Sequence, residues 1–133
     1  MTIEHDAGGM PVFPSDEWVG WLDAALSECR VDDTVGLVLE YHAYDDDASA
    51  FCWHVRIASG RVSAAVGRAG GAHGQPVVTL ASDRDTARSI TVEGASAQRA
   101  FAEGRLRFDG DPRLLLAARP AMEAIGAALA GAA

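Results

Sequence analysis

The side chains best suited to chemistry lie in two neighbouring segments of the first half of the chain. Both segments alternate apolar and polar residues, which is typical of strands with one buried face. Their polar positions carry Glu40, His42, Cys52, His54 and Arg56. In one pairing register, His42 lies opposite Cys52 and Glu40 opposite His54. In a register shifted by two, His42 lies opposite His54 and Glu40 opposite Arg56. Either arrangement could tune an imidazole or bind a divalent metal.

This polar cluster nevertheless favours a structural interpretation. A metal site needs three or four convergent ligands, and nothing in the pattern fixes such a geometry. We therefore predict a solvated, non-catalytic sheet face with a cross-strand ion pair. The glycine-rich segment 67–75 lacks the Lys-Ser/Thr ending of a phosphate loop, so we predict a mobile hairpin connection there. No catalytic residue, metal or cofactor is expected.

Length and charge narrow the class of protein. The chain has 133 residues, which predicts one domain, and a formal net charge of −8 with eleven arginines and no lysine. The missing lysine is typical of a genomic base bias, as in bacteria. The negative charge argues against nucleic acid as a partner and against stable association with an anionic membrane. No long apolar run or secretory signal is seen, and the two cysteines fit reduced thiols, so we expect a cytoplasmic protein.

Periodicity predicts the elements that must position any site. Residues 1–14 show no period and contain glycine and proline, which predicts a flexible arm before a single domain spanning 15–133. An amphipathic helix should start at Ser15 and end near Arg30. Three strands in a meander follow, the last two joined by a tight Ser59-Gly60 turn that sets Trp53 opposite Val66.

The second half predicts shorter elements. A fourth strand over 77–81 precedes a helix that we expect Ser82 to cap. A short helix capped by Ser96 ends at Gly104, and a fifth strand carries Leu106 and Phe108. Asp111 and the following proline start another helix, with a kink or restart near Arg119. Strands with one apolar face suit an α+β fold with helices packed on one face of the sheet.

The second half also resembles the sterol carrier protein type 2 family. The resemblance rests on an ordered set of residues across about a third of the chain. These are Val78, Thr79, Leu80, Ser82, Asp83, Asp85, Gly94, Gln98, Ala100, Phe101, Gly104, Leu106, Phe108, Gly110 and Asp111. The resemblance implies a five-stranded, mainly antiparallel sheet with a hydrophobic tunnel between sheet and helices. It also implies that Gln98 can orient a ligand oxygen, although this amide could equally bond the neighbouring turn.

The expected ligand contacts are apolar side chains of the helices and of the sheet face toward them, together with Gln98. They are Trp18, Leu22, Trp53, Val55, Leu80, Ile90, Gln98, Phe101, Leu115, Met122, Ile125 and Leu129. Trp18 is also a natural core anchor, because a tryptophan buries a large apolar area. Phe101 should face the interior and form part of the pocket wall or of the core beside it. The segment from Pro120 to Ala133 should act as a lid or tunnel mouth over the helical side of the sheet.

The leading hypothesis is a soluble, non-catalytic carrier for a hydrophobic small molecule, either monomeric or homodimeric. The ligand would be a sterol, a fatty-acyl chain, an isoprenoid or a polyketide-like compound. One alternative is a small cyclase or isomerase that uses the same pocket with a buried acid, for which Glu93 and Glu123 are candidates. Another is an accessory module that binds a protein partner through an exposed apolar patch.

Overall fold

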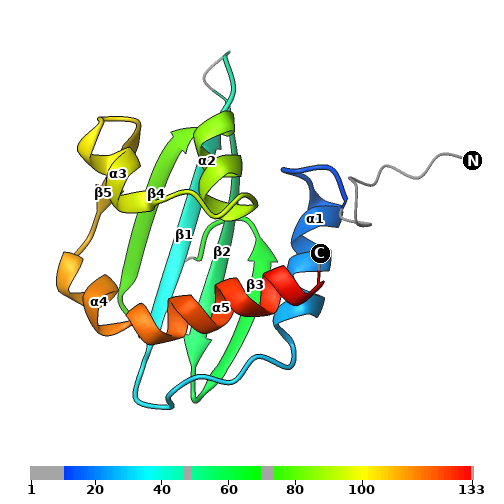
Figure 1. Cartoon of the computed structure of the whole chain (residues 1–133), viewed down its shortest axis with the longest axis vertical. Coiled ribbons are helices and arrows are strands. Elements are labelled where there is room, and N and C mark those ends of the chain that lie inside the picture. Colours follow the sequence, from blue (N-terminus) through cyan, green and yellow to red (C-terminus); the bar gives the residue numbers. More distant parts are fainter. Residues whose placement is uncertain (1–10, 47–48, 70–73, 133) are drawn as a thin grey trace, which may run out of the picture.

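The computed structural model describes residues 11–46, 49–69 and 74–132. A five-stranded sheet with the strand order β3-β2-β1-β4-β5 forms its centre (Figure 1). The strands are β1 (Leu37–Tyr44), β2 (Ala50–Ala58), β3 (Arg61–Val66), β4 (Val77–Asp83) and β5 (Leu106–Asp109). Strands β1 and β4 are parallel, and the other neighbouring pairs are antiparallel. The predicted mainly antiparallel sheet is therefore confirmed.

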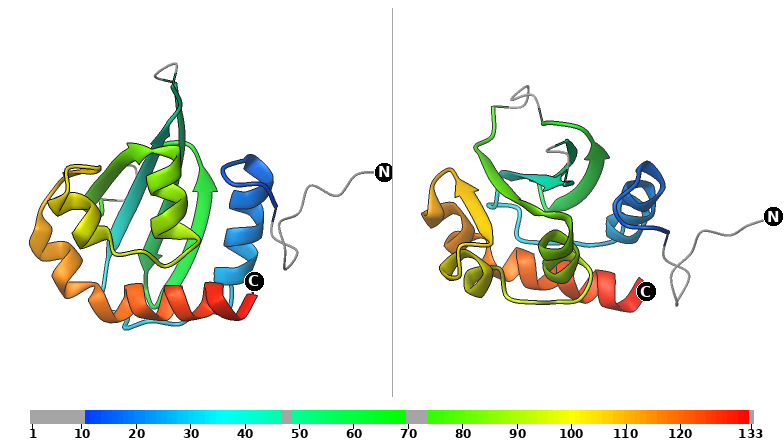
Figure 2. Two further views of the ribbon diagram at one scale, coloured as in Figure 1. Left: turned by 45° about the horizontal axis from the view of Figure 1, so that its top comes forward. Right: turned by 90° about the horizontal axis from the view of Figure 1, so that it is seen from above.

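The helices cover one face of this sheet, as predicted (Figures 1 and 2). They are α1 (Asp16–Leu26), α2 (Arg84–Thr91), α3 (Ala97–Ala102), α4 (Pro112–Ala117) and α5 (Arg119–Ala132). Helix α5 extends from α4 across the sheet to α1. The restart predicted near Arg119 is confirmed, since the helical path breaks at Ala118 between α4 and α5.

Two helix ends differ from the prediction. Helix α1 ends at Leu26 rather than near Arg30, because the Ser27 hydroxyl donates to the Ala24 carbonyl at 2.7 Å and competes with the continuing helix. Helix α2 is capped by Asp83 rather than Ser82. The Asp83 carboxylate accepts from the Thr86 amide at 3.1 Å and from the Thr86 hydroxyl at 2.6 Å. It therefore gives a partner to one free backbone amide of the first turn and is held in place by a second hydrogen bond.

The first hairpin takes one of the two registers considered, and the second takes the predicted register. Glu40 pairs with His54 and His42 with Cys52, which is the first of the two registers considered. Trp53 pairs with Val66 across the second hairpin. Its turn residues, Ser59 and Gly60, have φ angles of 54° and 79°, as a two-residue turn with two positive φ values requires.

Aromatic side chains fill the space between α1 and the sheet. Trp18 and Trp53 are 1% and 0% exposed, and their ring centroids lie 5.4 Å apart with the rings nearly perpendicular. Phe13 packs edge-on against both tryptophans. Because Phe13 is buried, the predicted arm over 1–14 does not remain free up to residue 14. Residues 1–10 of that arm lie outside the described residues.

The connection from β3 to β4 differs from the predicted hairpin connection. Strand β3 lies at the sheet edge, whereas β4 pairs with β1 on the far side of β2, so this connection is a crossover and not a hairpin. Its described parts, residues 67–69 and 74–76, lie on the side of the sheet that lacks helices (Figure 2, right). There Gln75 bridges two groups of β2, because its Oε1 accepts from Arg56 Nε and its Nε2 donates to the Ile57 carbonyl, both at 3.0 Å.

The β1 part of the polar face is buried rather than solvated, whereas Cys52, His54 and Arg56 on β2 are half-buried. Glu40 and His42 are 8% and 7% exposed, and Glu40 Oε2 lies 2.6 Å from His42 Nε2. Glu40 Oε1 accepts from the Ala69 amide in the crossover at 3.0 Å. The predicted cross-strand ion pair is therefore replaced by a pair along β1. The alternating pattern placed these residues on one face correctly, but it could not show that the chain returns across that face.

Candidate functional site

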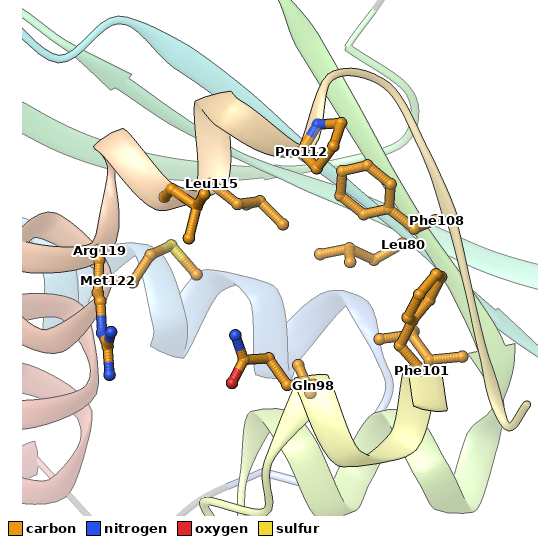
Figure 3. Close-up of a pocket in the computed structure, with 11 residues that line it drawn as sticks. Leu80, Gln98, Phe101, Phe108, Pro112, Leu115, Arg119 and Met122 are labelled. Atoms are coloured by element: carbon orange, nitrogen blue, oxygen red, sulfur yellow. The ribbon is translucent and has the colours of Figure 1, made fainter. Parts of the chain in front are cut away.

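An apolar pocket opens at the end of the helical layer where α3, β5 and α4 meet the start of α5. Its volume is about 490 Å³. Figure 3 shows its lining side chains converging on a shared space from these elements and from β4. They are Leu80, Ala97, Gln98, Phe101, Leu106, Phe108, Pro112, Leu115, Leu116, Arg119 and Met122. Only Gln98 and Arg119 among them carry polar groups.

A second, smaller pocket of about 90 Å³ lies deeper toward α2 and β1. It shares five lining residues with the larger pocket, namely Leu80, Ala97, Leu106, Leu115 and Met122. Ile90 and Tyr41 contribute to its inner end. Burial raises the pKa of the Tyr41 phenol to about 12, so this group stays neutral and can donate a hydrogen bond at any physiological pH.

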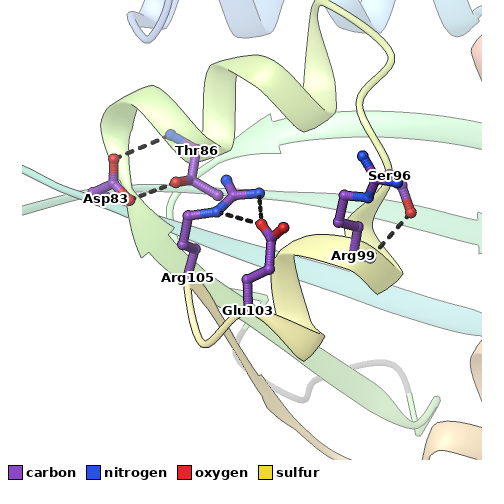
Figure 4. Close-up of polar contacts among 6 residues, drawn as sticks. All are labelled: Asp83, Thr86, Ser96, Arg99, Glu103 and Arg105. Atoms are coloured by element: carbon purple, nitrogen blue, oxygen red, sulfur yellow. Dashed lines mark hydrogen bonds and ion pairs between the residues drawn. The ribbon is translucent and has the colours of Figure 1, made fainter.

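Short, firmly capped elements hold the pocket walls in place. Ser96 accepts from the Arg99 amide at 3.1 Å and starts α3, while Asp111 accepts from the Arg113 amide at 2.9 Å and starts α4. Figure 4 shows the Ser96 cap beside the Asp83 cap of α2 and the Glu103–Arg105 ion pair that follows α3. The starts of α3 and α4, which form two walls of the larger pocket, are thus fixed by residues next to them in the sequence.

Gly110 sets how closely β5 and α4 approach β4. Its φ is 127°, and a Cβ atom at this position would lie 3.2 Å from the Val77 carbonyl oxygen and 3.3 Å from Val78 Cα. Only glycine adopts this backbone conformation without strain and leaves room for the neighbouring backbone. The Gly110-Asp111 pair noted in the sequence therefore combines a close approach with a helix cap.

The comparisons with known proteins agree with this geometry. Residues 23–123 match the model of the SCP-2 sterol transfer family. The chain belongs to this family. The match covers the sheet, α2, α3, α4, the pocket-lining residues and the first turn of α5, which confirms the resemblance found in the sequence. Membership of the SCP-2 sterol transfer family points to a lipid-binding or lipid-transfer protein.

Solved structures show the same fold at low sequence identity. Sterol carrier protein 2 from Yarrowia lipolytica, in its apo form, is 14% identical, with a TM-score of 0.63 over 80% of this chain and 97% of that one. Sterol carrier protein domain 2 of Helicoverpa armigera is 16% identical, with a TM-score of 0.59 over 90% and 94%. A Thermus thermophilus protein described as possibly a sterol carrier protein is 17% identical, with a TM-score of 0.58 over 91% and 90%. No curated protein matches the sequence.

Six of the twelve predicted contact residues line these pockets. They are Leu80, Ile90, Gln98, Phe101, Leu115 and Met122. The other six lie in or against the packed core around α1, β2 and the inner face of α5, and their roles as ligand contacts stay predictions. They are Trp18, Leu22, Trp53, Val55, Ile125 and Leu129. The hydrophobic tunnel between sheet and helices that the family resemblance implied stays a prediction. Aromatic side chains pack near α1, and the two pockets lie at the end of the helical layer with α3 and α4.

Phe101 corrects a specific expectation. It lines the larger pocket, but its side chain is 58% exposed at the rim instead of facing the interior. Ala100, the other member of the Ala-Phe pair, is the buried residue, at 1% exposure. Since adjacent residues of a helix point about 100° apart, burial of the alanine turns the phenylalanine outward.

Sequence reasoning missed several lining residues as ligand contacts. Leu106 and Phe108 were expected to point inward from a strand but were not assigned to the site, and Leu116 and Arg119 were not considered. Helical spacing carried a signal for Arg119, because it lies three residues before Met122 and so shares a face with it. The Gln98 side chain makes no hydrogen bond among the described residues, which leaves its amide free to meet a ligand.

The two acids considered for the enzyme alternative do not line these pockets. Neither Glu93 nor Glu123 lines either pocket. Glu93 pairs with Arg88 at 3.5 Å, and Glu123 lies 3.7 Å from Arg119.

Among the described residues, no three His, Cys, Asp or Glu side chains converge as a metal site would require. Within the same residues, no helix is long and apolar enough to cross a membrane.

The buried Glu40–His42 pair links β1 to the start of the crossover through hydrogen bonds. Its burial acts to raise the pKa of Glu40, but hydrogen bonds from the Ala69 amide and His42, with the charges of His42 and Arg68, outweigh this and hold the pKa below its usual value. Glu40 is therefore a carboxylate at neutral pH and fastens the crossover to β1. His42 borders the smaller pocket, although its ring is bonded to Glu40.

Proposed function

We propose that this chain binds and carries a hydrophobic small molecule, with the larger pocket as its binding site. The observation that supports the proposal is an open pocket of about 490 Å³ with nine apolar lining residues. Ligand sites typically enclose about 300–1,000 Å³ and combine a mostly apolar lining with a few polar groups. The family match supports the same conclusion, since its printed description is sterol transfer.

The proposed ligands are sterols, fatty-acyl chains, isoprenoids and polyketide-like compounds. We propose a non-catalytic, cytoplasmic carrier, monomeric or homodimeric, that makes no stable contact with nucleic acid or membrane. The lining supports binding without chemistry, because it offers one amide and one guanidinium but no carboxylate, thiol or imidazole at the larger pocket. A cyclase or isomerase would require an acid or base there.

Filling the pocket from α4 tests the proposal. Leu115 lines both pockets, so Leu115→Trp should occupy the space that the ligand takes. Ala117→Trp on the same helix is the matched control, because this residue is exposed and lines neither pocket. Wild type and the Ala117→Trp variant should bind a fluorescent fatty-acyl or sterol probe and release a co-purified lipid in native mass spectrometry. Leu115→Trp should lose at least tenfold in affinity.

Two outcomes would count against the proposal. Equal probe binding by the Leu115→Trp variant would move the site elsewhere, provided that circular dichroism shows a folded protein. A wild-type protein that carries no lipid and binds none of these probes would overturn the carrier function itself.

A further inference from the structure

The larger pocket carries a single charge, and this charge is positive. Acidic residues outnumber basic ones by 19 to 11 in the chain, yet no Asp or Glu lines this pocket and Arg119 does. Gln98 is the only other lining residue with a polar side chain. Figure 3 shows Gln98 coming from α3 and Arg119 from α5, with Leu115 and Phe108 on the apolar wall. We call Gln98 and Arg119 the rim pair.

Arg119 is available to a ligand. Its side chain is 74% exposed, and its contact with Glu123 joins Nε to Oε2 at 3.7 Å, beyond hydrogen-bond distance. An exposed pair of this kind on a helix contributes little to stability and is readily exchanged. No hydrogen bond engages the guanidinium among the described residues. The helix places it over the pocket, because Met122, one turn later on α5, lines the same space.

We infer that the rim pair selects amphiphiles with an anionic oxygen head group, a carboxylate or a phosphate, over neutral molecules of the same apolar length. The inference rests on the proposed function and assigns the orientation of its ligand. The guanidinium presents a planar fork of N–H donors that matches carboxylate and phosphate oxygens. The Gln98 amide adds one more donor at the same rim. The apolar tail would then lie toward Leu115 and Met122, where the lining is wholly apolar.

The position of the charge at the rim also explains why such a ligand could enter. A buried anion would lose its hydration without full compensation, which is costly. At an open rim the head group keeps part of its water while the arginine pairs with it. A neutral sterol or alcohol gains nothing from the guanidinium and leaves it solvated, so the discrimination comes from the head group alone.

Calorimetric titration with ligands that differ only at the head tests the inference. Dodecanoic acid, dodecyl phosphate and dodecanol share one tail. The two anions are used below their critical micelle concentrations and the alcohol below its solubility limit. Wild type should bind the acid or the phosphate about 3- to 10-fold more tightly than the alcohol, the range expected for a partly exposed charge-assisted contact. Comparing the two anions shows which head group fits better, and a preference for either supports the inference.

Variants then assign the preference to the rim pair. Arg119→Gln should abolish the advantage of the anionic ligands, so that the acid, the phosphate and the alcohol bind this variant with similar affinity. Arg107→Gln makes the same change of net charge, but this exposed residue of β5 does not line the pocket, so it should keep the preference. Gln98→Ala should weaken the anions about 2- to 3-fold, as loss of one donor predicts.

The result that overturns the inference differs from the one that overturns the proposed function. Equal affinity for acid, phosphate and alcohol in the wild type, or a preference that survives Arg119→Gln, refutes selection by the rim pair while the carrier function stands. Failure of all three ligands and of a sterol probe to bind refutes the carrier function and, with it, the inference.

Discussion

At the scale of single residues, the pocket and the core make opposite demands on aromatic side chains. Phe13 is 6% exposed and packs against two tryptophans, whereas Phe101 is 58% exposed on the pocket rim. The same side chain therefore contributes to packing at one position and offers an apolar surface to a ligand at the other. We expect a ligand bound in the pocket to cover part of the exposed Phe101 ring.

These two phenylalanines give a matched pair of variants. Phe101→Ala should change the free energy of unfolding by less than about 1 kcal/mol, because little packing is lost. It should weaken binding of a long-chain ligand. Phe13→Ala should cost about 3–5 kcal/mol, as is typical for a buried phenylalanine. Urea unfolding and probe titration measure both effects. A large loss of stability in Phe101→Ala would show that this ring packs in the core.

At the scale of elements, the crossover between β3 and β4 depends on polar contacts with the sheet. Its described parts are joined to β1 through the Glu40 carboxylate and to β2 through Gln75. An extended segment without its own secondary structure has few internal hydrogen bonds, so its buried backbone groups must find partners on the sheet. The Glu40–His42 pair thus supports the topology of the sheet.

Stability should therefore depend on pH through Glu40. Its pKa is lower in the folded chain than in the unfolded one, so its charge stabilises the fold above the unfolded value of about 4.3, and this contribution disappears as the pH falls through the folded value. Glu40→Gln should lower the free energy of unfolding by about 1–3 kcal/mol at pH 7. The difference from wild type should shrink below about pH 4.

Urea unfolding at pH 7, 5 and 3 checks this dependence. Glu28→Gln is the control, because Glu28 is exposed and lies after the end of α1. Its variant should match wild type at each pH. A stability difference for Glu40→Gln that stays constant from pH 7 to pH 3 would contradict the assigned role of the carboxylate.

Helix α5 joins the pocket to the core. Met122 lines both pockets, while Ala121 and Ile125 on the same helix are buried at 4% and 8% exposure. A segment that buries residues against the sheet and α1 contributes to the hydrophobic core as well as to the pocket. The lid predicted for the stretch from Pro120 onward stays a prediction, and its inner face is part of the core.

At the scale of the whole molecule, charge is unevenly distributed. The segment 97–133, which supplies α3, β5, α4 and α5, contains five arginines and four acids, whereas the rest of the chain carries the acidic excess behind the net charge of −8. Most pocket-lining residues thus come from a nearly neutral part of an acidic protein. Long-range repulsion from anionic surfaces comes from the remainder.

Vesicle co-sedimentation tests the consequence for membranes. The protein should remain in the supernatant with phosphatidylcholine vesicles, and adding phosphatidylserine should not increase binding, because basic residues are what attract proteins to anionic bilayers. Bovine serum albumin gives the background, and a polybasic peptide gives the positive control. Binding that rises with phosphatidylserine and falls with salt would show that the arginines around the pocket form a docking surface.

The sequence alone determined most of the secondary structure and the family. Strict alternation set the strand faces, since a shift of one residue would turn every side chain to the wrong face, and with the Ser59-Gly60 turn it set the register of the second hairpin. The first hairpin kept two registers open, because a shift of two residues preserves the faces, and the structure selected one of them. Ser15, Ser96 and Asp111 marked helix starts correctly, because their side chains satisfy local backbone amides. These are short-range rules, and they need no knowledge of distant contacts.

Only the tertiary structure decided which apolar residues pack and which enclose space. Trp18, Trp53, Phe108 and Leu115 all lie on apolar faces, yet the first two fill the core and the last two line the pocket. Binary pattern is the same for a filled and a hollow interior, because it records polarity and not distance. The burial of Glu40 and the position of Arg119 at the pocket likewise depend on how distant segments meet. A returning crossover contacts Glu40, and α5, which carries Arg119, meets α3, β5 and α4 at the pocket.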